Sequence, residues 1–172
     1  MIIVFRYGHR VVRDKRVTTH CALISRAFGV DKVVYSGQRD NHFEDSINKA
    51  SKSWGGDFTI EHTLGYLSYL TKKKEEGFKL IHLTMYGINL PDFKKEIKAL
   101  RKEKIIIFIG AEKVPKEVYN LADYNVAVGN QPHSEIAALT LFLDRLLDGK
   151  ELLTKYKGAK REITETWKNK KK

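Results

Sequence analysis

The chain has 172 residues, of which 42% are hydrophobic and 31% are charged, and its formal net charge at pH 7 is +11. This size and apolar content suit one globular domain with a sizeable core and exclude a largely disordered chain. No stretch approaches the roughly 20 apolar residues that a membrane helix needs. The start MIIVFR lacks the basic lead of a secretory signal, and the lone Cys21 excludes an internal disulfide and a multi-cysteine metal site. We therefore expect a cytoplasmic protein.

Apolar runs recur along the chain and alternate with helical patterns. We expect strands at Ile2–Phe5, Lys32–Tyr35, Phe58–Glu61, Lys79–Leu83, Ile105–Ile109 and Asn125–Val128. Several of these runs are continuously apolar, as are strands that are covered on both faces. The alternation predicts an α/β fold, a three-layer sandwich with a mainly parallel sheet.

Helix start signals lie between the expected strands. We expect helices to begin at Thr18 or Thr19, at Asp40, at Thr63, at Pro91 and at Glu135. The first is expected to end near Gly29, where glycine suits a helix terminus. The last, Glu135–Asp148, is the most apolar. Core burial is its default interpretation and a contact with a second subunit is the alternative.

Two of the expected strands stop at a glycine that is followed by a polar segment. Ile105–Ile109 stops at Gly110, and the run 126–128 stops at Gly129. Open α/β sheets place ligands at such strand ends. Neither loop has the lysine of a P-loop, and no G-x-G-x-x-G follows any expected strand. The spacing alone is compatible with two interpretations, an ordinary connecting loop of an α/β fold or a ligand site.

Four sequence blocks resemble those of the archaeal tRNA cytidine-56 2'-O-methyltransferases, which belong to the SPOUT superfamily. The blocks are RYGHRVVRDKRVTTH at 6–20, HLTMYG at 82–87, GAEKVP at 110–115 and NVAVGNQPHSEIAAL at 125–139. They follow the family's order and cover most of the chain up to about residue 150. The resemblance implies 2'-O-ribose methylation of tRNA at cytidine 56 of the T-loop, with S-adenosylmethionine as methyl donor and no metal. It also implies a C-terminal trefoil knot threaded around 105–135, and a homodimer that builds the site at its interface.

The resemblance also implies which residues contact the cofactor. They are Leu83 and two loops, the first comprising Gly110, Ala111, Glu112, Lys113 and Val114, and the second Val128, Gly129, Asn130, Gln131, Pro132, His133, Ser134 and Glu135. From the residues alone, Glu112 is instead a surface glutamate paired with Lys113 or Lys116. Ser134 and Glu135 also form a good helix start, a role that is compatible with cofactor contact.

In SPOUT ribose methyltransferases, an arginine of the first block generally helps the ribose hydroxyl to lose its proton. A guanidinium is effectively always protonated, so we expect it to stabilise developing alkoxide charge while a phosphate or water takes the proton. Arg16 is the first choice because it precedes the expected cap at a strand-to-helix turn. Arg10 and Arg26 are the alternatives, and Arg26 is expected on the surface or at a subunit contact.

Positive charge is concentrated at the two ends of the chain. Residues 1–16 carry a net +4 and residues 150–172 a net +6, around a body of net +1. Such clusters attract polyphosphate, and we expect Arg6, Arg10, Arg13 and Lys15 to bind RNA. We expect residues 1–150 to form one methyltransferase domain and residues 151–172 a basic tail with some helical character, which could equally serve only solubility.

Three rival functions remain open at this point. The chain could methylate another RNA position, bind RNA without catalysis, or be a small-molecule α/β enzyme with incidental charge. The six histidines are scattered, without an H-x-x-x-H pair or a helical His/Glu ligand pattern, so no metal site is expected.

Overall fold

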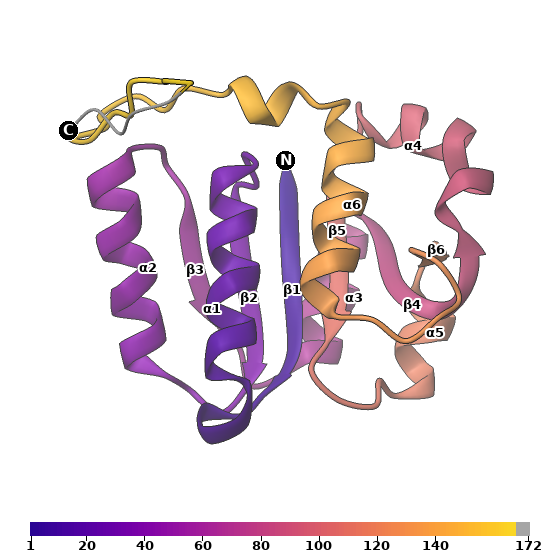
Figure 1. The fold of residues 1–172 in the computed structure, drawn as a ribbon. Helices are drawn as coiled ribbons and strands as arrows, with labels where there is room; N and C mark the ends of the chain where they lie inside the picture. The colour runs from indigo at the N-terminus through magenta and orange to yellow at the C-terminus, as the bar shows by residue number, and fades with distance from the viewer. Residues whose placement is uncertain (168–172) are drawn as a thin grey trace.

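A computed structural model of the chain describes residues 1–167, so the last five residues of the expected basic tail lie outside it. Strands and helices alternate along the chain (Figure 1). They are β1 Ile2–His9, α1 Val11–Ala27, β2 Lys32–Gly37, α2 Asn41–Trp54, β3 Thr59–His62, α3 Tyr66–Glu75, β4 Lys79–Asn89, α4 Lys94–Leu100, β5 Ile105–Gly110, α5 Lys116–Leu121, β6 Tyr124–Ala127 and α6 Glu135–Leu147. Two 3-10 turns, η1 Leu90–Phe93 and η2 Lys150–Leu153, precede α4 and follow α6.

The strands form one six-stranded sheet in the order β3-β2-β1-β5-β4-β6. Every pairing is parallel, which confirms the expected α/β fold with a parallel sheet. The chain winds outward from β1 through β2 to β3 and then starts again on the other side at β4. Strand order therefore reverses beside β1 and β5, and such a reversal leaves a crevice at the carboxyl ends of the strands.

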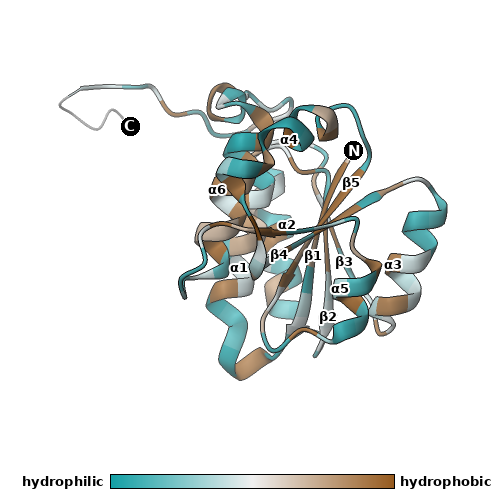
Figure 2. Cartoon of the chain, turned by 90° about the vertical axis from the view of Figure 1, so that its right-hand side faces the viewer, coloured by the Kyte–Doolittle hydropathy of each residue, from teal (hydrophilic) through white to brown (hydrophobic). Residues whose placement is uncertain are grey.

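Helices cover both faces of the sheet, and the apolar core lies between the layers (Figure 2). Alternate strand residues serve the two faces: Val4 and Ile107 pack towards α1, α2, α4 and α6, whereas Phe5 and Phe108 pack towards α3 and α5. The rings of Phe5 and Phe108 stack with centroids 5.3 Å apart. Because both faces of the sheet are covered, the sequences of the strands are continuously apolar.

The first helix begins earlier than the sequence signals indicate. It starts at Val11, with Arg10 as its N-cap residue, so the expected start at Thr18 or Thr19 is wrong. Thr18 is buried inside the helix, where its hydroxyl lies 2.9 Å from Nδ1 of His9. The Asp14 carboxylate accepts a hydrogen bond from the Arg10 N–H at 3.1 Å, which satisfies a backbone donor at the helix start without a Thr or Ser cap.

Other boundaries differ by a few residues, and two caps are as expected. Asp40 accepts from the Phe43 N–H at 3.0 Å and caps α2, and Ser134 accepts from the Ala137 N–H at 3.2 Å and caps α6. The third helix begins at Tyr66 rather than at Thr63. The six-residue α5 was not expected, because its length is too short for a clear helical period.

The tail beyond η2 crosses the edge of the sheet at which the strands begin (Figure 1). Within the described residues it has no helix after η2, so the expected helical character is limited to that turn. The Gly56 N–H donates to the Lys157 carbonyl at 3.0 Å, and the Tyr156 hydroxyl donates to the Ala27 carbonyl at 3.1 Å. These bonds hold the segment against the ends of α1 and α2.

Candidate functional site

A cavity of about 450 Å³ lies at the carboxyl ends of β4, β5 and β6. Its walls come from the end of β4, from the loops that follow β5 and β6, and from the first residues of α6. The cavity is lined by Leu83, Gly110, Ala111, Glu112, Lys113, Val114, Val128, Gln131, Pro132, His133, Ser134 and Glu135, all of which are among the expected cofactor contacts. The fold thus brings together two loops that the sequence separates.

Gly129 and Asn130 are the two expected contacts that do not line the cavity. The Asn130 amide donates to the Met85 carbonyl at 2.7 Å and pairs with the side chain of Asn89, so it ties the loop to β4. Gly129 lines a neighbouring apolar groove between α4 and α6. The structure thus gives Asn130 a role in holding the second loop and places Gly129 outside the cavity lining.

Two glycines shape the first loop. A Cβ at Gly110 would lie 2.5 Å from the Val114 side chain and 3.0 Å from the Glu112 carbonyl oxygen, so a larger residue would have to displace this tight turn. Gly8 has a φ of +77°, and a Cβ there would lie 2.7 Å from Oε1 of Glu112. The end of β1 and the cavity loop after β5 are therefore in direct contact.

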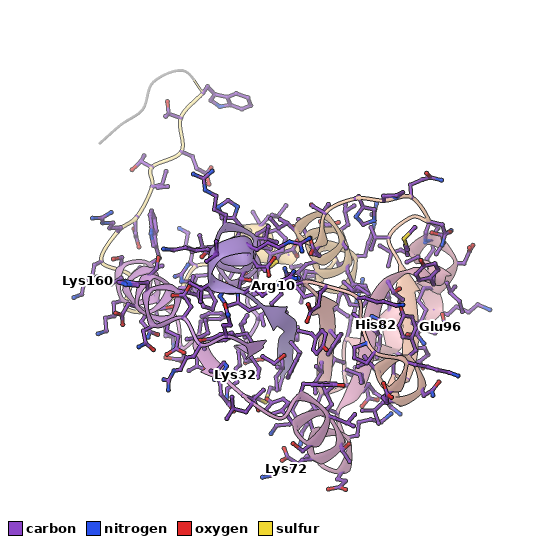
Figure 3. The ribbon with its side chains drawn as sticks, turned by 90° about the horizontal axis from the view of Figure 1, so that it is seen from below. Arg10, Lys32, Lys72, His82, Glu96 and Lys160 are labelled. Carbon is purple, nitrogen blue, oxygen red and sulfur yellow. The ribbon has the colours of Figure 1, made fainter. Side chains whose placement is uncertain are left out.

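Arg10 bridges the same two segments. Its guanidinium lies 2.9 Å from the Asp14 carboxylate and 3.4 Å from that of Glu112, and it donates to the Ala111 carbonyl at 3.2 Å. Burial alone would raise the pKa of Asp14, but hydrogen bonds from Arg10 outweigh it and hold that pKa below its usual range. Figure 3, which looks onto this edge, shows Arg10 beside the end of β1. A guanidinium thus contacts the loop after β5 whose residues line the cavity.

The other arginines of the first block lie elsewhere. Arg16 is exposed in the second turn of α1, so its expected place at the strand-to-helix turn is wrong, and Arg13 and Lys15 are also exposed on this helix. Arg26 is buried at the far end of α1, where it donates to the Gly55 carbonyl at 2.7 Å and stacks on Tyr156, so it is not a surface residue.

Arg6 was expected to contact RNA, but its side chain is 1% exposed. It points from β1 towards α1 and α6, and its guanidinium lies 3.4 Å from the carboxylate of Glu135. Glu135 also lines the cavity. Arg6 therefore supports the cavity wall from inside the fold, and its expected place on the RNA-accessible surface is wrong.

One polar wall of the cavity was missed by sequence reasoning. It consists of His82 and Thr84 on β4 and Tyr119 on α5, with Asn125 of β6 behind them. The block HLTMYG contains two of these residues, although only Leu83 was singled out from it. Tyr119 lies on the unexpected helix α5, so no sequence pattern pointed to it.

Two observations on the described residues concern metal ligands and the single cysteine. Among residues 1–167, no group of three or more His, Cys, Asp and Glu side chains is placed to hold a metal ion. Burial raises the pKa of Cys21 to about 11, so this thiol stays protonated at neutral pH, as expected for a small buried apolar residue. The helices of the described part are all too short or too polar to span a bilayer.

Comparison with known proteins gives close relatives over nearly the whole chain. The family model described as "tRNA ribose 2'-O-methyltransferase, aTrm56" matches residues 54–172. Two proteins named tRNA (cytidine(56)-2'-O)-methyltransferase, from Thermococcus kodakarensis and Methanocaldococcus jannaschii, are 51% and 49% identical to this chain. Each match covers 95% of this chain, and 91% and 90% of the two relatives.

Solved structures with the same fold are more distant in sequence. The TrmH/SpoU tRNA modifying enzyme of A. aeolicus superposes with a TM-score of 0.66 at 17% identity, covering 88% of this chain and 76% of that one. The SpoU methyltransferase AviRb of Streptomyces viridochromogenes, solved in complex with AdoMet, gives a TM-score of 0.60 at 12% identity over 87% of this chain and 57% of that one. These likenesses establish the fold.

Proposed function

The chain belongs to the aTrm56 family of tRNA ribose 2'-O-methyltransferases, and from this premise we propose that it methylates the 2'-hydroxyl of tRNA cytidine 56 in the cavity at the ends of β4, β5 and β6. S-adenosylmethionine is the methyl donor. The observation that carries the assignment to this cavity is that two loops, distant in sequence, close around it with nearly all of the residues expected to contact the cofactor.

The cavity fits a nucleoside-sized cofactor on its own geometry. Its volume lies within the range of small-molecule sites, roughly 300–1,000 Å³, and the absence of a side chain at Gly110 keeps its loop tight. When bound, the cofactor supplies a methyl group that its sulfonium already activates. The contribution of the chain is to hold the reacting groups in line, which can lower such a barrier by roughly 7–11 kcal/mol.

We assign the guanidinium that stabilises the developing alkoxide to Arg10. Of Arg10, Arg16 and Arg26, it is the one whose side chain contacts residues that line the cavity. The proton then passes to a phosphate or to water, because the guanidinium itself stays charged. Arg13, Lys15 and Arg16, exposed on the same helix, are placed to contact the phosphates of the tRNA.

The family resemblance extends the proposal to the assembly and to the path of the chain. Residues 105–135 thread a C-terminal trefoil knot, two copies form a homodimer, and the enzyme works in an archaeal cytoplasm. The side chains of Val12, Leu23 and Leu141, which are 98%, 38% and 46% exposed, support a second copy packing on α1 and α6. Residues 1–150 act as the methyltransferase domain, and the basic tail 151–172 as an added RNA contact.

The test is methyl incorporation from labelled S-adenosylmethionine into an unmodified tRNA transcript, followed by mapping of the modified nucleotide. We expect the label at position 56, and we expect a transcript with a 2'-deoxy nucleotide at that position to accept none. Label at another nucleotide would indicate a different RNA site. Tight, salt-dependent tRNA binding without cofactor binding would indicate an RNA-binding protein, and the absence of tRNA binding a small-molecule enzyme.

A further inference from the structure

Two hydroxyl groups face the cavity from the wall that β4 and α5 form. Thr84 lies at the end of the regular part of β4 and Tyr119 on α5, and both line the cavity. Their oxygens are 3.1 Å apart, a hydrogen bond in which either group can be the donor. Neither side chain belongs to the loops expected to hold the cofactor.

The surrounding contacts fix this pair in position. The ring of Tyr119 meets that of His82 edge to face, with centroids 4.5 Å apart. Nδ1 of His82 lies 2.9 Å from the Asn125 side-chain oxygen, and the Asn125 amide donates to the Tyr119 carbonyl at 3.1 Å. This network links three elements, β4, α5 and β6, so the tyrosine hydroxyl is held in place before any ligand arrives.

The hydrogen count of the pair leaves one donor free. Two hydroxyls carry two hydrogens, and the bond between Thr84 and Tyr119 uses one of them. The Thr84 oxygen also accepts from the Tyr86 N–H at 3.4 Å, which uses lone-pair capacity and no hydrogen. Whichever hydroxyl donates to the other, one O–H hydrogen of the pair remains available to an acceptor on a bound ligand.

The neighbours of the pair indicate which part of the cofactor would supply that acceptor. This wall is uncharged, because burial lowers the pKa of His82 and keeps the ring neutral at pH 7. The charged residues that line the cavity are Glu112 and Lys113, in the loop after β5, and Glu135, at the start of α6, and none of them belongs to β4 or α5. An uncharged aromatic wall suits the flat adenine ring, which carries acceptor nitrogens in its plane, better than a charged amino-acid group.

We propose that the Thr84–Tyr119 hydroxyl pair donates a hydrogen bond to a ring nitrogen of the cofactor's adenine. This inference rests on the proposed function, since it takes S-adenosylmethionine as the occupant of the cavity. His82 and Asn125 act as positioning residues that hold the Tyr119 ring. The pair selects for a ligand that presents an unprotonated ring nitrogen at this wall.

Titration calorimetry of the full chain with S-adenosylhomocysteine tests the proposal. We expect Tyr119→Phe and Thr84→Val each to weaken binding about threefold to tenfold, the usual effect of one lost hydrogen bond. In the double variant, the affinity for S-adenosylhomocysteine should fall by less than the product of the two single-variant factors, because the hydroxyls act as one unit. Thr84→Ser, which keeps the hydroxyl, should retain the wild-type affinity.

Tyr124→Phe is the matched control. Tyr124 is also half-buried and meets a ring edge to face, that of Phe93, but it does not line the cavity. We expect this variant to bind with wild-type affinity. Unfolding curves of all variants, measured in parallel, identify any that bind weakly because they are misfolded.

Deaza analogues of S-adenosylhomocysteine then locate the bond. One of the 1-, 3- and 7-deaza compounds should bind the wild type more weakly, and Tyr119→Phe should weaken its binding no further. Unchanged affinity in both Tyr119→Phe and Thr84→Val, or an equal added loss with all three analogues, would overturn the proposal. A wild-type chain that does not bind S-adenosylhomocysteine would instead refute the proposed function, and this inference with it.

Discussion

The guanidinium of Arg6 lies 3.4 Å from the carboxylate of Glu135, so an ion pair joins the first strand to the last helix across 129 positions of the chain. Arg6 is buried, whereas Glu135 is about one-third exposed and lines the cavity. Glu135 starts α6, where its charge also opposes the positive end of the helix dipole. The same carboxylate therefore contributes to the stability of the fold and to the shape of the cavity.

Removal of the Glu135 carboxylate should destabilise the fold. Glu135→Ala leaves a buried guanidinium whose Nε already lacks a partner in the described residues, and we expect a loss of about 1–3 kcal/mol in the free energy of unfolding. Glu135→Gln keeps an acceptor oxygen and should lose less. Urea unfolding measures both values. Equal losses in the two variants would mean that the negative charge beside Arg6 supplies the stabilisation, and that the retained acceptor oxygen and the packing of the side chain contribute nothing.

Arg10→Ala should lower the turnover number by about 100-fold or more, the usual effect of removing one donor to a developing oxyanion. Arg16→Ala is the matched control, because Arg16 is an exposed arginine of the same helix. We expect this variant to raise the KM for tRNA and to leave the turnover number within a few-fold of wild type. Single-turnover methyl transfer at saturating tRNA separates the two effects. The opposite pattern would assign the catalytic role to Arg16.

Gly8→Ala should damage both stability and cofactor binding. The left-handed φ of +77° makes any L-residue unfavourable by about 1–2 kcal/mol, and the new Cβ would also displace the Glu112 side chain from its place on Gly8. Gly77→Ala is the control, since Gly77 has a φ of +86° but no atom within 4 Å of the Cβ position. Thermal unfolding and S-adenosylhomocysteine titration compare the two. Equal losses of thermal stability and of S-adenosylhomocysteine affinity in the two variants would show that the contact with Glu112 is unimportant.

Stability should fall as the solution becomes mildly acidic. Burial lowers the pKa of His82 below its ordinary value of about 6.5, although the bond to Asn125 opposes the shift, and burial lowers that of His9 as well. The unfolded chain therefore takes up protons first. The stabilisation is complete above pH 6.5 and is lost as the pH falls towards the folded-state pKa values, with a slope of at most about 1.4 kcal/mol per pH unit for each histidine.

Chemical denaturation between pH 5 and pH 7.5 measures this slope. His82→Gln should have a shallower dependence on pH than the wild type, and the contribution of His9 should remain. Parallel curves for the two proteins would show that His82 does not titrate differently in the folded and unfolded states.

The strands and most helices were predictable because their signals are local. The continuous apolar run of β5 and the Asp40 cap of α2 each depend on a few neighbouring residues. The start of α1 was not predictable from Thr18, because the bond that its hydroxyl makes is to His9, on a neighbouring element. A preference for capping does not indicate which partner a hydroxyl finds in the folded chain.

The site was predictable in part. Strands that end at glycine leave a mark in the sequence, but that mark alone left a ligand site and an ordinary loop both open. The resemblance to the family implied the contact residues, and those of the first loop, from Gly110 to Val114, all line the cavity. The Thr84–Tyr119 wall leaves no such mark, because it forms only when α5 packs beside β4. The net charge of a segment does not show which of its arginines are exposed. Arg6 lies in a basic segment of the sequence, yet it is buried and pairs with Glu135.

The two outermost strands of the sheet, β3 and β6, have only four residues each. Each therefore offers few free backbone groups to which another chain could add a strand. We expect concentrated solutions of this protein to resist ribbon-like aggregation, so any self-association should arise from helix packing and should be reversible on dilution.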